Sequence, residues 1–114
     1  MERNLNRKLN TAKKTACSIL ERAGYKIEIT NNNIFCITAM RKSEWRIIAI
    51  GIEEIIKCHW FRNQIKKLER LPNPSPDTIN KEIWIREEDG YNFRLYFYEN
   101  GQWVDEDLNP VNIF

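Results

Sequence analysis

The chain has 114 residues, 42% of them hydrophobic, and a formal net charge of +2, so it is long and apolar enough to bury a core as one domain, 1–114. Four glycines, four prolines and 30% charged residues exclude fibrous and wholly disordered classes. The longest apolar run, Ile47–Ile52, is too short to span a membrane, so no membrane partner is expected. The absence of a secretory signal and the odd, widely spaced set of three cysteines predict a reducing, cytoplasmic setting.

Charge is divided unevenly along the chain. Residues 1–76 carry 15 Lys and Arg against seven Glu, a balance of +8, and residues 77–114 carry three against nine Asp and Glu, a balance of −6. Such asymmetry is typical of a domain with a basic face for nucleic acid and an acidic region turned away from it. The alternative is that lysine-rich helices simply fall early in the chain.

The first half of the chain predicts one helix and three strands. Apolar residues recur at three- and four-residue steps from Leu5 to Ala23, which indicates an amphipathic helix, and Gly24 follows as its C-cap. Alternating and continuously apolar segments then predict strands at 25–30, 34–40 and 45–50. Short polar turns separate these strands, so we expect a three-stranded antiparallel meander.

The second half predicts another helix and a further pair of strands. The helix covers roughly 55–71, and Phe61, Ile65 and Leu68 form its core-facing stripe. Three prolines in 71–76 then make a stiff connector, because proline cannot continue a helix. The sequence predicts strands at 82–86 and 92–98 and a hairpin at Asn100-Gly101 that returns through Gln102-Trp103-Val104. The expected fold is α/β (α+β), in the order α-β-β-β-α-β-β, with a mixed central sheet flanked by helices.

Three motifs in the second half carry a resemblance to a known superfamily. A Leu-Pro-x-Pro break precedes a Glu–aliphatic–Trp–aliphatic strand and a Gly-aromatic-x-aromatic-Arg strand, and a polar residue, Gln64, lies on the second helix. The runs are Leu71-Pro72-Asn73-Pro74, Lys81-Glu82-Ile83-Trp84-Ile85 and Gly90-Tyr91-Asn92-Phe93-Arg94. With the order of elements, they resemble the restriction-endonuclease-like, or Holliday-junction-resolvase-like, superfamily over most of the chain.

The resemblance implies a metal site whose ligands are missing here. Members carry an Asp on the second strand and Glu-x-Lys on the third, which hold Mg²⁺ and activate water. The corresponding positions are Cys36, Ala49 and Gly51, and none of these residue types offers a carboxylate or a lysine. We therefore expect a degenerate catalytic site with no metal and no cofactor, and the balance is against enzymatic activity.

A shifted motif would restore an active Mg²⁺-dependent nuclease, and this alternative stays open. The available groups are Glu28, Glu44, Glu53, Glu54 and Lys57. Glu28 lies on the first strand, Glu44 in a turn, and the Glu53-Glu54 pair falls at the start of the second helix, where acids complement the helix dipole. The adjacent Cys58 and His59 lack the further ligands that a zinc site needs.

Basic residues supply the candidate nucleic-acid contacts. They lie on the outer face of the first helix, in the turn after the second strand, and on the second helix. The set is Arg7, Lys14, Arg22, Arg41, Lys42, Arg62, Lys66 and Lys67, to which Arg70 adds on the second helix. If both helices and the turn face the same way, this basic N-terminal face is able to neutralise several phosphates of DNA or RNA. A solvated charged surface is the alternative.

Aromatic residues gather near the C-terminus, where the charge is acidic. Alternation along 94–98 sends Leu95 and Phe97 to one face and Tyr96 and Tyr98 to the other. This pattern favours cross-strand packing or a homodimer interface over base stacking. The sequence thus predicts a non-cleaving nucleic-acid-binding protein. The alternatives are a protein-interaction subunit that dimerises through the C-terminal aromatic hairpin and, less favoured, a double-stranded RNA-binding domain.

Overall fold

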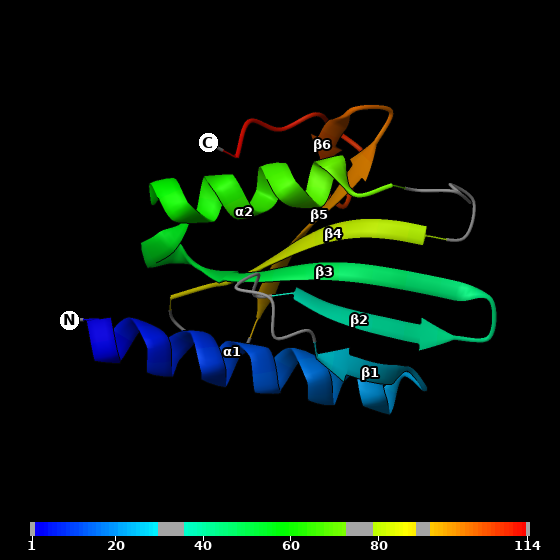
Figure 1. The fold of residues 1–114 in the computed structure, drawn as a ribbon, viewed down its shortest axis with the longest axis horizontal. Helices are drawn as coiled ribbons and strands as arrows, with labels where there is room; N and C mark the ends of the chain where they lie inside the picture. The colour runs from blue at the N-terminus through cyan, green and yellow to red at the C-terminus, as the bar shows by residue number, and fades with distance from the viewer. Residues whose placement is uncertain (1, 30–35, 73–78, 89–91, 114) are drawn as a thin grey trace.

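The computed structural model describes residues 2–29, 36–72, 79–88 and 92–113. It has two α-helices, a short 3₁₀ turn and six strands in one mixed sheet, so the expected α/β class and order of elements are confirmed (Figure 1). The elements are α1 (Glu2–Arg22), β1 (Lys26–Ile29), β2 (Cys36–Arg41), β3 (Glu44–Ile52), η1 (Glu53–Ile55), α2 (His59–Arg70), β4 (Ile79–Arg86), β5 (Phe93–Glu99) and β6 (Gln102–Val104).

The strands lie in the sheet in their sequence order, from β1 at one edge to β6 at the other. All neighbours are antiparallel except β3 and β4, which are parallel because α2 carries the chain back between them. The meander expected over residues 25–50 is confirmed as β1–β2–β3. The parallel pairing of β3 and β4 runs from Trp45↔Ile79 to Ile52↔Arg86. β3 is therefore longer than predicted at both ends, and β4 begins earlier than predicted.

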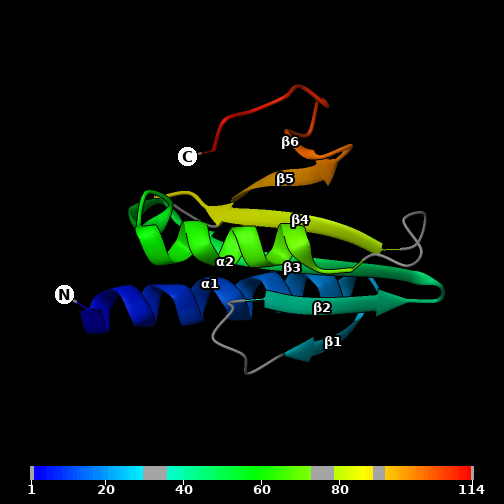
Figure 2. The same ribbon diagram turned by 45° about the horizontal axis from the view of Figure 1, so that its top comes forward.

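The two helices cover opposite faces of the sheet. Side chains alternate along β3, and a Cβ added at Gly51 would lie 2.8 Å from the ring of Phe61, so this face of β3 lies beneath α2. The other face packs against α1, whose end accepts a hydrogen bond from Arg41 at the carbonyl of Ala23. Both views show this three-layer arrangement of α1, sheet and α2 (Figures 1 and 2).

The core fills both interfaces between sheet and helices. The expected stripes of both helices are buried, including Phe61, Ile65 and Leu68 on α2. On α1 the buried residues are Leu9, Ala12, Ala16 and Leu20. Gly24 ends α1 at φ +92°, and the amides of Gly24 and Tyr25 donate to the carbonyls of Glu21 and Leu20, which is the hydrogen-bond pattern of a Schellman cap.

The start of the second helix differs from the sequence prediction. Glu53 and Glu54 lie in the 3₁₀ turn η1, and α2 begins only at His59, because the backbone of Cys58 is extended (φ −74°, ψ 140°) and breaks the helix. α1 begins at Glu2, three residues earlier than expected. Residues 31–33, between the first two predicted strands, residues 89–90, between the strands predicted at 82–86 and 92–98, and most of the proline connector lie outside the described residues. Among the described residues, neither helix has the combination of length and apolar character needed to cross a membrane.

Candidate nucleic-acid interface

Helix α2 divides into an apolar inner face and a cationic outer face. Its sequence, HWFRNQIKKLER, buries Phe61, Ile65 and Leu68 at a spacing of three and four residues. Five exposed residues on its outer side form what we call the α2 basic face: Arg62, Asn63, Lys66, Lys67 and Arg70. The packing that seats α2 on the sheet thereby fixes the direction in which these cations point.

The cations of the α2 basic face are regularly spaced. Arg62, Lys66 and Arg70 follow one another at four-residue steps, so each lies one turn beyond the last, with a rise of about 6 Å. Lys67 and Arg70 also fall in the last turn, where positive charge complements the helix dipole. The result is a row of exposed positive charge along one side of the molecule.

The described structure places no acidic partner against the C-terminal part of this row. Glu69 is the single acid of α2, and its Oε2 accepts a hydrogen bond of 2.7 Å from Nε1 of Trp103 on β6. Within the part of the chain that the structure describes, no carboxylate pairs with Lys66, Lys67 or Arg70. Their charges are therefore available to a ligand.

An open hollow of about 450 Å³ lies along the same helix, lined by α2 residues that include Trp60, Asn63, Gln64 and Lys67. The Trp60 side chain is 40% exposed beside it. Oε1 of Gln64 is buried and has no hydrogen-bond partner among the described residues. An exposed indole and several cations are the groups that stack on a base and neutralise a phosphate.

Two contacts hold the C-terminal end of α2 in place. Nζ of the buried Lys81 on β4 donates to the carbonyls of Glu69 and Leu71, at 3.0 and 2.7 Å. Burial lowers the pKa of Lys81 below its usual range, although the nearby Glu69 carboxylate acts in the opposite direction. These bonds satisfy carbonyls that the helix itself leaves free.

The α1 cations of the predicted set lie on the other layer. Arg7, Lys14 and Arg22 are exposed on the side of α1 opposite its buried stripe. Because α1 and α2 cover opposite faces of the sheet (Figure 2), these three residues lie on a different layer of the molecule from the α2 basic face. The six predicted cations that lie on the helices are thus divided between two layers and do not form one surface.

The turn residues of the predicted set differ from each other in role. Arg41 donates from Nη1 to the carbonyl of Ala23 at 3.0 Å and from Nη2 to Glu44 at 3.3 Å. Its guanidinium also lies 4.5 Å from the ring centre of Tyr25. Lys42 is exposed in the turn, at φ +56°. Arg41, for which the sequence predicts a phosphate contact, therefore ties the turn to the end of α1.

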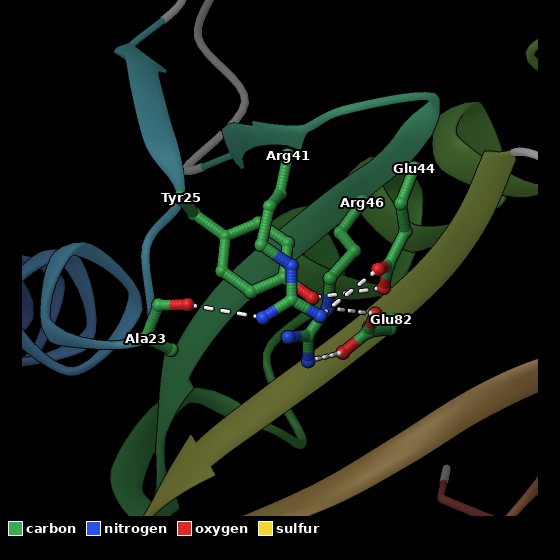
Figure 3. Close-up of polar contacts among 6 residues, drawn as sticks. All are labelled: Ala23, Tyr25, Arg41, Glu44, Arg46 and Glu82. Atoms are coloured by element: carbon green, nitrogen blue, oxygen red, sulfur yellow. Dashed lines mark hydrogen bonds and ion pairs between the residues drawn. The ribbon is translucent and has the colours of Figure 1, made fainter.

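A buried ion pair lies on the α1 side of the sheet, and sequence reasoning missed it. Arg46 on β3 holds Glu82 on β4 through two hydrogen bonds of 2.6 Å, from Nε and Nη2 (Figure 3). Nε1 of Trp84 donates to the same carboxylate at 3.0 Å. The Tyr25 hydroxyl donates to Glu44 at 2.8 Å. We call these five residues the Arg46 cluster.

The electrostatics of the Arg46 cluster keep its arginine charged. Burial by itself disfavours the charged guanidinium, but hydrogen bonds and charge from Glu82, with a contribution from Tyr25, hold the pKa of Arg46 above its ordinary value. The guanidinium also lies 5.2 Å from the ring centre of Tyr25 and 5.5 Å from that of Trp84. The cluster is a closed structural network in which every charge has a partner.

The positions that the resemblance assigns to metal binding do lie on neighbouring strands. Cys36 on β2 pairs directly with Ala49 on β3, and Gly51 lies two residues further along β3, on the face beneath α2. The Phe61 ring fills the space that a side chain at Gly51 would need. Ala49 is buried and has no oxygen ligand to offer. The residues present do not fit a Mg²⁺ site.

The acids considered for a shifted motif are dispersed. Glu53 pairs with Arg94, and Glu54 accepts from Lys8 at 2.7 Å. Glu44 belongs to the Arg46 cluster, and Glu28 is exposed on β1. Lys57 is exposed in the segment between η1 and α2, and Sγ of Cys58 lies 3.9 Å from the carbonyl of Glu54. The described residues contain no group of three or more acidic, cysteine or histidine side chains able to hold a metal ion.

The C-terminal aromatic residues pack across strands. The rings of Tyr98 and Trp103 are 4.9 Å apart, and those of Trp84 and Phe93 are 5.5 Å apart. Trp103 is 7% exposed. The expected alternation on β5 is confirmed, because Tyr96 pairs with Ile83 on the α2 side of the sheet and Leu95 with Trp84 on the α1 side.

No family model matches the chain, and no curated protein is significantly similar to it. The function is therefore inferred from the geometry described above.

Proposed function

We propose that this protein binds nucleic acid through the α2 basic face and does not cleave it. The observation that carries the proposal is a row of exposed cations, Lys66, Lys67 and Arg70 among them, with no carboxylate paired to these three in the described structure. Contacts from Lys and Arg to phosphates supply most of the affinity in such complexes. Exposed cations without partners are the side chains that make those contacts.

Trp60 favours unpaired nucleotides as the ligand. Its indole is 40% exposed at the edge of the hollow along α2, next to the cations. A base must be unstacked from its neighbours before it stacks on a protein ring, and single strands and loops supply such bases. Single-stranded DNA or RNA, or an unpaired region within a duplex, is therefore the ligand class that we propose.

Two observations support the absence of cleavage. The positions where the resemblance implies an acid and a lysine are Ala49 and Gly51, and the Phe61 ring closes the space above Gly51. The acids Glu44, Glu53 and Glu54 each have a cationic partner elsewhere in the fold. A metal-dependent mechanism needs carboxylates that converge on one ion.

Fluorescence anisotropy with labelled single-stranded and duplex oligonucleotides tests the proposal. We expect saturable binding at about 50 mM salt that weakens steeply by about 200 mM salt, because phosphate contacts release counterions. The variant Lys66→Gln/Lys67→Gln should reduce the slope of log K against log salt by about 1.4 on single strands, or about 0.7 for each phosphate that the variant leaves without a cation.

The matched control removes the same charge from the other layer. Arg7→Gln/Lys14→Gln lowers the net charge by the same amount but changes the outer side of α1, so we expect it to leave the salt slope close to that of the parent chain. An equal decrease in both variants would mean that only net charge matters, and it would overturn the α2 assignment. Absence of binding to every probe would overturn the function itself.

A gel of the same mixtures incubated with Mg²⁺ tests the second half of the proposal. We expect intact oligonucleotides at every protein concentration. Products that disappear on addition of a chelator would contradict the absence of cleavage, and the acids Glu28, Glu44, Glu53 and Glu54 would be substituted next.

A further inference from the structure

The two edge strands of the sheet differ in whether another segment of the chain pairs with their outer side. At one edge, Val104 of β6 bridges to Pro110, and the amide of Val111 donates to the carbonyl of Trp103, so the chain itself covers β6. At the other edge, β1 pairs with β2 on one side and with no other described strand (Figure 2). An edge strand presents unpaired backbone donors and acceptors to any strand that can lie beside it.

The charges on β1 are arranged so that the strand complements itself. Lys26 and Glu28 are exposed on either side of Ile27, and both point to the face opposite α1. Charged side chains on an edge strand discourage pairing with another chain unless the partner strand places opposite charges against them. If a second copy of β1 lies antiparallel to the first, centred on Ile27, Lys26 of each copy faces Glu28 of the other.

The adjacent side of α1 repeats this pattern. An open groove of about 740 Å³ runs between α1 and β1, and its lining includes Lys13, Cys17, Glu21 and Ile27. Lys13 and Glu21 lie four residues before and after Cys17, so a two-fold axis through the seam brings the lysine side of one helix towards the glutamate side of the other. Burial and the nearby Glu21 raise the pKa of the Cys17 thiol, and Lys13 acts in the opposite direction. Because the thiol stays protonated, Cys17 adds no charge to the groove.

We propose that the chain forms a two-fold symmetric homodimer by antiparallel pairing of β1 with β1 of a second copy, which joins the two sheets edge to edge. A two-fold interface requires one surface that complements itself, and β1 is the described edge strand that does so in its backbone and its charges. This surface is distinct from the C-terminal aromatic hairpin, and the inference does not depend on nucleic-acid binding.

Sedimentation velocity across a range of protein concentrations tests the dimer. The parent chain should shift from 13.7 kDa towards twice that mass as its concentration rises. Lys26→Glu and Glu28→Lys each place like charges opposite one another at two symmetry-related positions, and each should weaken dimerisation about tenfold or more. The double variant Lys26→Glu/Glu28→Lys restores opposite charges and should recover the parent behaviour.

Matched substitutions away from the seam separate this effect from net charge. Lys57→Glu and Glu106→Lys make the same two changes of charge at exposed positions on other parts of the surface and should leave dimerisation unchanged. Circular dichroism confirms that each variant is folded. A chain that stays at 13.7 kDa at every concentration overturns the proposal, as does a dimer that is insensitive to the single variants or that the double variant fails to restore.

Discussion

The Arg46 cluster and the α2 basic face use the same kind of side chain in opposite ways. The Arg46 side chain is 16% exposed and its partner Glu82 is 2% exposed, with two short hydrogen bonds between them. Lys66, Lys67 and Arg70 are exposed and have no described carboxylate partner. A buried cation must be paired because desolvation is costly, whereas an exposed cation keeps its hydration until a ligand replaces it. Position in the fold, not residue type, separates a structural cation from a ligand-binding one.

The largest effect should come from breaking the buried pair. Glu82→Ala leaves the largely desolvated Arg46, 16% exposed, without its counter-charge, and we expect the free energy of unfolding to fall by about 3 kcal/mol in urea titrations. The double variant Arg46→Met/Glu82→Leu should recover much of this loss, since no charge is left unpaired. Lys66→Gln/Lys67→Gln should change stability by less than about 0.5 kcal/mol. A small effect at Glu82 would mean that the pair is not buried in solution.

The next largest effect on stability should come from disturbing the packing of α2 against β3. A Cβ added at Gly51 would lie 2.8 Å from Phe61 and 2.9 Å from Ile85, so Gly51→Ala forces side chains apart. We expect a loss of about 1–3 kcal/mol in the free energy of unfolding, measured in urea. Gly51→Ala/Phe61→Leu should be more stable than Gly51→Ala alone, because the smaller side chain vacates the space. A single variant as stable as the parent would show that α2 is seated differently.

Trp60 tests whether the exposed side of α2 binds bases. Trp60→Ala should weaken the binding of single-stranded oligonucleotides by about 1–3 kcal/mol, which is the contribution of one stacked base, and should affect duplex binding much less. Trp45→Ala is the matched control, because Trp45 is 43% exposed on β3 and is not part of α2. Equal effects of the two substitutions in anisotropy titrations would remove Trp60 from the interface.

The smallest effect concerns the exposed end of the Arg46 cluster. The hydrogen bond from Tyr25 lowers the pKa of Glu44 below its ordinary value of 4.5, and the hydrogen bond and charge of Arg41 act in the same direction, against a smaller opposing effect of burial. The stabilisation is therefore present above about pH 4.5 and is lost as the pH falls through the lower, folded-state pKa. Because the carboxylate is 39% exposed, we expect less than about 1 kcal/mol.

Thermal or urea unfolding between about pH 2 and 6 measures this contribution. In Glu44→Gln the acid-side loss of stability should be shallower than in the parent. The exposed Glu106→Gln is the control and should follow the parent curve. A Glu44→Gln curve parallel to that of the parent would contradict the role of the Tyr25 hydrogen bond.

Local patterns in the sequence predicted most of the elements. The stripe of Phe61, Ile65 and Leu68 predicted the buried side of α2, and Asn100-Gly101 predicted a hairpin that forms with both residues at positive φ. Such signals come from neighbours within a few residues, where periodicity and turn chemistry operate. The predicted start of α2 was wrong: Glu53–Ile55 form a 3₁₀ turn, and the extended backbone of Cys58 delays the helix to His59.

The sequence by itself determined the elements, their order and the buried side of each helix, because these follow from spacing along the chain. The tertiary structure alone decided which charges meet. Arg46 and Glu82 are 36 residues apart and become partners only through the parallel register of β3 and β4. Only the placement of α1 and α2 on opposite faces of the sheet divided the predicted cations of the helices into two groups, and only the strand order left β1 at an edge. Contacts between distant segments have no local signature, so they emerge when the chain packs.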